Sequence, residues 1–219
     1  MSRQRDGILS VGLTGGIACG RTTVCGVFSR RGACVVDADA IAHRLMAPGG
    51  AAVGTVVGAF GGRFLAPDGG IDRRALAKEV FADPTMRRRL ESILHPMIVA
   101  EADKIIDAFA ATAGRGVAVT DAALLVETGG YTRYQRLIVV TCTPAVQLER
   151  LMKRDKLSEK DARARIAAQA PLAEKQRLAD YIIETSGSLE QTKARSNEVY
   201  TMLLDDLKRL PDLPRRRPT

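Results

Sequence analysis

The chain has 219 residues, 46% of them hydrophobic and 26% charged, which are the proportions of a globular protein with its own core and exclude a mainly disordered chain. Its net charge of +8 favours nucleic acid, membrane phosphate or a polyanionic small molecule as the partner. More than half of that excess lies in residues 1–7 and 208–219, so we expect two flexible ends and an only mildly basic body.

The first predicted element is a short apolar strand over residues 8–14, followed by a glycine-rich turn and a helix over 22–31. The turn follows the phosphate-loop pattern G-x-x-x-x-G-K-T, with arginine in place of the lysine. Glycines let backbone N–H groups turn inward around a phosphate, and the helix adds the donors of its first turn. A strand-to-helix turn without a ligand is the alternative. We expect ATP to be bound by Gly15, Gly16, Ile17, Ala18, Cys19, Gly20, Arg21, Thr22 and Thr23, with the Thr22 hydroxyl on Mg²⁺.

Two residues of this loop carry expectations of their own. Arg21 keeps the positive charge of lysine but is planar and bulkier, so we expect nucleotide binding to persist more surely than fast turnover. Cys19 lies where backbone donors and a helix N-terminus converge, which lowers the pKa of a thiol, and we expect ATP to protect it from alkylation. The four cysteines lack zinc-site spacing and fit reduced thiols in a cytoplasmic protein.

A second strand over residues 33–36 is followed by two carboxylates, Asp37 and Asp39, and a helix. Open parallel sheets bind ligands at the carboxyl ends of their strands, so Asp39 is the candidate that orients an acceptor hydroxyl and takes its proton. The alternative for Asp39 is the N-cap of a helix over 40–46, and Asp37 is interpreted as structural.

The stretch 45–62 is uncharged and contains the row Gly50, Gly54, Gly58 and Gly62, which imitates a membrane helix face. We predict instead a soluble helix whose small residues allow close packing. Helices are predicted over 72–81 and 85–110, with no strand between 47 and 112.

Apolar strands return at 117–120, 137–141 and 181–183, and an amphipathic helix follows at 189–207. Two charged helices precede the last strand, opened by Thr143-Pro144 and by Ser158 with Asp161. Apolar strands alternating with helices predict an α/β fold with a five-stranded parallel sheet in three layers. Asp121, at the end of the third strand, is a candidate for holding Mg²⁺ through a water or for capping a loop.

Several motifs occur in one order: residues 12–17, 36–39, 94–96, 124–127 and 147–150. Together they resemble the dephospho-CoA kinase family of P-loop kinases, over about residues 8–204. The departures from that family's pattern are Ala18, Cys19, Arg21, Ala123 and Thr185.

The resemblance implies ATP-dependent phosphorylation of the 3′-hydroxyl of dephospho-CoA, the last step of coenzyme A biosynthesis, with ATP and Mg²⁺. It implies a nucleotide-binding core (8–45, 113–142 and 178–207), a helical acceptor-binding insertion (46–112) and a helical lid (143–177). It makes Asp39 the base, places Arg21 and Arg150 on phosphate oxygens, and assigns acceptor binding to Asp39, Arg44, Arg73, His95, Leu124 and Glu127.

Alternatives remain at two of these positions and for the function. Arg150 shares a helix face with Arg154, and such a face can be simply solvated; Arg165 and Gln169 are expected to share another. His95 before Pro96 can equally start a helix. The rival functions are a different P-loop small-molecule kinase and a nucleotide-binding homologue weakened by Arg21. Few aromatic residues argue against nucleic acid, and we expect no membrane partner and a monomer or weak homo-oligomer.

Overall fold

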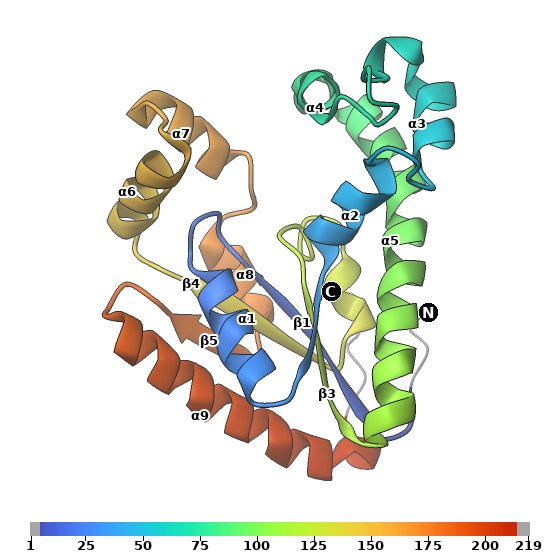
Figure 1. Ribbon diagram of the computed structural model, residues 1–219. Coiled ribbons are helices and arrows are strands. Elements are labelled where there is room, and N and C mark those ends of the chain that lie inside the picture. The colour runs from blue at the N-terminus through green and yellow to red at the C-terminus, as the bar shows by residue number, and fades with distance from the viewer. Residues whose placement is uncertain (1–4, 214–219) are drawn as a thin grey trace. The chain divides into compact units, whose positions relative to one another are not determined.

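The computed structural model describes residues 5–213, in which strands and helices alternate (Figure 1). The strands are β1 (Ile8–Gly15), β2 (Cys34–Asp37), β3 (Gly116–Asp121), β4 (Arg136–Thr141) and β5 (Tyr181–Glu184). The helices are α1 (Arg21–Arg30), α2 (Ala38–Met46), α3 (Val53–Phe60), α4 (Arg73–Ala82), α5 (Pro84–Ala113), α6 (Pro144–Asp155), α7 (Glu159–Ala167), α8 (Leu172–Leu178) and α9 (Leu189–Lys208). Short 3₁₀ turns occur at Gly62–Phe64, Gly130–Arg133 and Leu210–Asp212.

The five strands form one sheet in the order β2-β3-β1-β4-β5. Strand β1 runs parallel to both β3 and β4, and β5 runs parallel to β4. Leu13 is paired with Asp121, and Gly15 with Val140. The carboxyl ends of β1, β3 and β4 therefore meet at one edge of the sheet, where a parallel sheet binds its ligands.

Alternate residues of β4 separate the two faces of the sheet. Ile138 and Val140 belong to a core with residues of α1 and α9, whereas Leu137 and Val139 pack with Leu125 on the other face. Because successive side chains of a strand point to opposite faces, a strand buried on both reads as a continuous apolar run. The predicted three-layer α/β fold is confirmed.

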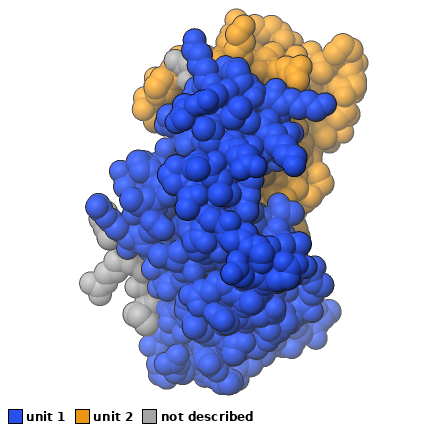
Figure 2. Space-filling view, turned by 90° about the vertical axis from the view of Figure 1, so that its left-hand side faces the viewer, with its two compact units in different colours: residues 1–36, 106–219 blue, residues 37–105 orange. Residues whose placement is uncertain are grey.

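The chain divides into two compact units, coloured separately in Figure 2. The first contains residues 1–36 and 106–219, and the second contains residues 37–105. The insertion expected at 46–112 overlaps most of the second unit, which begins earlier, at the end of β2. That this unit binds the acceptor stays a prediction.

The glycine row does not do what we expected of it. Gly54 lies inside α3 and Gly58 near its end, and a Cβ added at either would meet no atom within 4 Å. The predicted close packing is therefore wrong, and glycine at these positions lowers helix propensity without a packing gain. Gly50 lies in the turn before α3, where a Cβ would approach the Leu45 carbonyl oxygen to 2.3 Å. Among the described residues, no helix is long and apolar enough to cross a membrane.

The helix starts follow the predicted caps. Thr143 and Ser158 each accept a hydrogen bond from a backbone N–H three residues later, with Pro144 at the first position of α6. Helix α8 was missed because it is only 7 residues long and follows a proline.

Part of the predicted flexible ends is ordered. Arg5 pairs with Asp107 at 2.6 Å, and Leu210 is buried against the core of the first unit. Residues 1–4 and 214–219 lie outside the described residues, so the expectation for them stays a prediction.

Candidate active site

The phosphate loop lies between β1 and α1, in the strand, turn and helix order that the pattern requires. Gly20 precedes α1 in a left-handed conformation (φ 84°) and brings no side-chain cap. With no side-chain cap, the positive end of the α1 dipole favours an anion at the phosphate loop, although the Thr23 N–H itself bonds the Gly20 carbonyl at 3.0 Å. Phosphate binding by residues 15–23 stays a prediction.

Ala18 also has a positive φ, of 60°. A left-handed conformation destabilises a residue that has a Cβ by about 1 kcal/mol, whereas glycine adopts it without this penalty. The backbone geometry therefore explains why the resemblance leads one to expect glycine at this position.

Arg21, at the lysine position of the loop, forms an ion pair with a carboxylate. Its Nη1 bonds Oδ1 of Asp121, the last residue of β3. The two side chains are 19% and 13% exposed, so salt screens this pair less than an exposed one. Asp121 thus orients the guanidinium, which adds a third role to the two expected of it. Thr22 is exposed at the second position of α1.

Arg150 contacts the phosphate loop through Thr185. The guanidinium donates to the Thr185 hydroxyl at 3.0 Å and to the Thr185 carbonyl at 2.7 Å. The same hydroxyl lies 2.9 Å from the Cys19 carbonyl. A pocket of about 310 Å³ is lined by Gly20, Thr23, Arg150, Thr185, Gly187, Leu189 and Thr192. Arg150 therefore borders a pocket that begins at the phosphate loop.

Two further arginines of the predicted lid, Arg154 and Arg165, bond Asp155 instead. Arg154 bonds this carboxylate at 2.8 Å and Arg165 at 3.0 Å. The hydrogen bond from Arg154, followed by the two positive charges, lowers the pKa of Asp155. Gln169 lies beyond the end of α7, and its side chain bonds the backbone of Ile17, so the expected shared face with Arg165 is wrong.

Glu127 and Leu124 follow β3. Oε1 of Glu127 lies 2.7 Å from Nζ of Lys175, whose side chain is fully buried. It also accepts a hydrogen bond from the Ala170 N–H at 3.0 Å. Glu127 therefore connects the segment that follows β3 to α8. The role expected of Glu127 in acceptor binding stays a prediction. Leu124 is 41% exposed.

Within the second unit, Asp37 rather than Asp39 caps α2. The Asp37 carboxylate accepts a hydrogen bond from the Ala40 N–H at 2.8 Å. The capping alternative for Asp39 is therefore wrong, and Asp39 lies exposed in the first turn. His43 follows one turn later on the same face, and the Arg73 guanidinium donates to Nε2 of His43.

The remaining acceptor candidates are also exposed residues of the second unit. Arg44 lies in the last turn of α2. His95 lies inside α5 and not at its start, so the helix-start alternative is wrong.

Comparison with known proteins assigns the chain to a family. The family model for dephospho-CoA kinase matches residues 9–191. The chain belongs to the dephospho-CoA kinase family. It is 43% identical to the dephospho-CoA kinase of Anaeromyxobacter dehalogenans over 209 residues, which cover 93% of this chain and 97% of the relative.

Two solved structures resemble this chain over most of its length. The chain resembles TT1252 from Thermus thermophilus with a TM-score of 0.77 and 28% identity, over 90% of this chain and 97% of the other. It resembles the dephospho-CoA kinase from Campylobacter jejuni with a TM-score of 0.56 and 26% identity, over the same shares of the two chains.

Sequence reasoning missed two residues of this dephospho-CoA kinase family member. His43 was passed over although it lies one helical turn after Asp39. Lys175 lies between Leu172 and Leu178 at three-residue spacing, which predicts that one helix face carries all three. That spacing was the available signal for a buried lysine.

Cys19 is a buried thiol that contacts a second cysteine. It is 1% exposed, and its Sγ lies 3.0 Å from Sγ of Cys142. The hydrogen bond with Cys142 is the main cause that lowers the pKa of Cys19, and the same bond raises the pKa of Cys142. The predicted low pKa is supported, with a neighbouring thiol as the larger cause.

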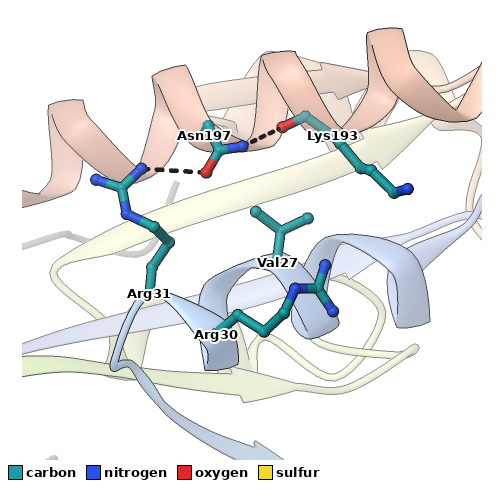
Figure 3. A pocket seen from close by; sticks show the side chains of 5 residues that line it. All are labelled: Val27, Arg30, Arg31, Lys193 and Asn197. Atoms are coloured by element: carbon teal, nitrogen blue, oxygen red, sulfur yellow. Dashed lines mark hydrogen bonds between the residues drawn. The ribbon is translucent and has the colours of Figure 1, made fainter.

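A second pocket, of about 450 Å³, lies near the C-terminal end of α1 (Figure 3). It is lined by Val27, Arg30, Arg31, Lys193 and Asn197, and Arg31 donates to Asn197 at 3.1 Å. The phosphate loop joins the opposite end of α1, so this basic pocket is separate from the candidate active site.

Proposed function

We propose that this chain transfers the γ-phosphoryl group of ATP to the 3′-hydroxyl of dephospho-CoA and releases coenzyme A and ADP. The observation that carries the proposal is the phosphate loop at the carboxyl edge of the sheet, in a chain that matches the family over residues 9–191. The comparisons do not favour a different small-molecule kinase.

In phosphoryl transfer, the protein positions the two substrates and stabilises the charge of the transferring group. The 3′-oxygen forms a bond to the γ-phosphorus while the bond to the β–γ bridging oxygen breaks, and ADP leaves. The hydroxyl proton passes to the carboxylate of Asp39, which makes Asp39 the general base. Its exposed position in the first turn of α2 supports that role.

Positive groups neutralise the charge of the transferring phosphoryl group. The proposed donors are the backbone N–H groups of the phosphate loop, Arg21 and Arg150. Asp121 holds the Arg21 guanidinium in a defined orientation, and Arg150 borders the pocket that begins at Gly20. Because a guanidinium is directional, its orientation decides which oxygens it contacts.

Mg²⁺ usually keeps several waters and takes one or two protein ligands in addition to substrate phosphates. Within residues 5–213, no cluster of three acidic, histidine or cysteine residues forms a metal cage. The exposed Thr22 hydroxyl fits such a sparse site as a direct ligand, and Asp121, which is bonded to the adjacent Arg21, fits it as a ligand through a water. The ion would neutralise phosphate charge.

We assign the binding of dephospho-CoA, the phosphoryl acceptor, to a set of mainly exposed residues. Arg73, held by His43, and Arg44 present positive charge for the pyrophosphate of dephospho-CoA. His95 and Leu124 complete the proposed acceptor set, together with Glu127 and Asp39.

The proposal is tested by incubating the full-length protein with Mg-ATP and dephospho-CoA and measuring coenzyme A. We expect the wild-type protein and Arg21→Lys to turn over within about tenfold of each other, because both keep a positive charge at the phosphates. Arg21→Ala is expected to lower kcat by roughly 100-fold or more, as for loss of one charge-stabilising donor. Nucleotide binding by the wild type without any coenzyme A formed would refute the proposed function.

A further inference from the structure

The backbone of Ile17 is held by side chains that lie far away in the sequence. Nε2 of Gln147, on α6, donates to the Ile17 carbonyl at 3.0 Å. Oε1 of Gln169, between α7 and α8, accepts from the Ile17 N–H at 2.7 Å. Both polar groups of one phosphate-loop residue are thus bonded to the α6–α8 segment, residues 144–178, which we call the arm.

The turn that carries Gln169 is itself anchored. Glu127 accepts from the N–H of Ala170, the next residue, and pairs with Lys175. The buried Lys175 ammonium also donates to the Ala123 carbonyl at 3.1 Å and lies 3.5 Å from the Gly15 carbonyl oxygen. Burying a charge is costly unless it is paired and hydrogen-bonded, so these partners confine Lys175 to one place.

The arm also packs closely against the loop at Gly16. A Cβ there would lie 2.5 Å from Nε2 of Gln147, 2.9 Å from Sγ of Cys19 and 3.3 Å from Cδ2 of Leu172. Two of these three neighbours belong to the arm. A side chain at Gly16 would therefore require Gln147 and Leu172 of the arm to move.

We propose that Gln147 and Gln169 are positioning residues that clamp Ile17, and that Lys175 and Glu127 anchor this clamp, so that the arm sets the conformation of the phosphate loop through its backbone. The arm then affects phosphate binding in two ways: directly through Arg150, and indirectly through the backbone of Ile17. The proposal rests on the proposed nucleotide-binding function.

One glutamine acts as a donor and the other as an acceptor, so the same substitution at both positions makes a matched pair of variants. Ile17 needs an acceptor at its N–H and a donor at its carbonyl. Gln169→Glu keeps an acceptor, whereas Gln147→Glu replaces the donor with a carboxylate oxygen that faces a carbonyl. Both substitutions add the same charge near the same loop residue, so repulsion of the nucleotide largely cancels between them.

The experiment measures ADP affinity by calorimetry, KM for ATP and for dephospho-CoA, and the melting temperature, all on the full-length protein. Gln147→Ala and Gln169→Ala are expected to weaken ADP binding and raise KM for ATP about tenfold, the effect of one lost hydrogen bond. KM for dephospho-CoA is expected to change less than twofold. Gln147→Glu is expected to bind ADP about tenfold more weakly than Gln169→Glu.

The control is Asp206→Asn, which breaks an ion pair with Arg136 at the start of β4, away from the loop. It is expected to lower the melting temperature without changing ADP affinity. Equal ADP affinities for the two glutamate variants, or wild-type affinity in both alanine variants, would overturn the proposal. ADP binding needs no turnover, so a wild type that binds ADP without forming coenzyme A would refute the proposed function and leave this test intact.

Discussion

Asp37 and Asp39 lie two positions apart in the chain and have different surroundings. Asp37 caps α2 through the Ala40 N–H, whereas Asp39 is exposed one residue into the helix. Asparagine caps helices about as well as aspartate but cannot act as a base at neutral pH. The same substitution therefore separates a structural carboxylate from the proposed base.

We expect Asp39→Asn to lower kcat for coenzyme A formation by roughly 100- to 10,000-fold, the usual contribution of a general base. Asp37→Asn should retain kcat within about threefold, because the cap survives. Steady-state kinetics on both variants checks this pair, and an Asp39→Asn enzyme with wild-type kcat would remove Asp39 from the chemistry.

Cys19 lies inside the phosphate loop, so the rate of its alkylation indicates whether nucleotide is bound. We expect saturating Mg-ATP to slow its alkylation, because the thiol is 1% exposed and reacts only when the loop opens. Cys34, at the start of β2, is half-buried and serves as the internal control whose rate stays unchanged. Mass spectrometry of the two peptides over time measures both, and equal Cys19 rates with and without ATP would contradict the expectation.

At the scale of elements, a buried ion pair joins β4 to α9. Arg136 bonds both carboxylate oxygens of Asp206, at 2.7 and 2.9 Å, and Tyr181 of β5 donates to the same carboxylate at 2.6 Å. Burial by itself raises the pKa of Asp206, but the hydrogen bonds from Arg136 and Tyr181 outweigh it and hold that pKa below its usual value. Burial and the bond to Asp206 raise the pKa of Tyr181 to about 12.

Asp206→Asn is expected to destabilise the protein by about 3 kcal/mol at neutral pH, because it leaves the Arg136 charge without its partner. The lowered pKa means that this contribution is present above the ordinary aspartate pKa of about 4 and is lost as the pH falls through the lower native value. The stability difference between wild type and variant should therefore shrink below about pH 4. Urea unfolding across pH checks it, and a constant difference would refute it.

At the scale of the whole molecule, the candidate residues fall into two groups. The phosphate loop, Arg150 and their pocket belong to the unit of residues 1–36 and 106–219, whereas Asp39, Arg73 and His95 belong to residues 37–105. The proposed function therefore predicts that ATP binds to residues of the first unit, and that residues 37–105 supply most of the acceptor contacts, with Leu124 and Glu127 of the first unit supplying the rest.

Arg73→Ala is expected to raise KM for dephospho-CoA about tenfold, which is the effect of losing one charged hydrogen bond. KM for ATP is expected to stay unchanged. Arg150→Ala should raise KM for ATP and leave KM for dephospho-CoA unchanged, and it should also lower kcat, because Arg150 is one of the proposed donors to the transferring phosphoryl group. Initial rates with each substrate varied in turn measure the split, and a rise in both constants for Arg73→Ala would contradict the division.

The strands and most helices were predictable because local pattern decides them. Residues 137–141 read as a continuous apolar run, and β4 follows with faces that alternate between two cores. The caps at Thr143 and Ser158 were predictable because a cap bonds a backbone group only three residues away. The packing around Gly54 and Gly58 was mispredicted, since a row of small residues does not say whether a neighbour is present.

The sequence by itself determined the parallel α/β fold, the phosphate loop and the arginine within it, because strand periodicity and loop spacing are local properties of the chain. Only the tertiary structure decided that Asp121 orients Arg21, that Thr185 holds Arg150, and that Gln147 and Gln169 clamp Ile17. Each of these contacts joins residues from 35 to 152 positions apart, and pairing over such separations depends on the order of the strands in the sheet, which no local pattern contains.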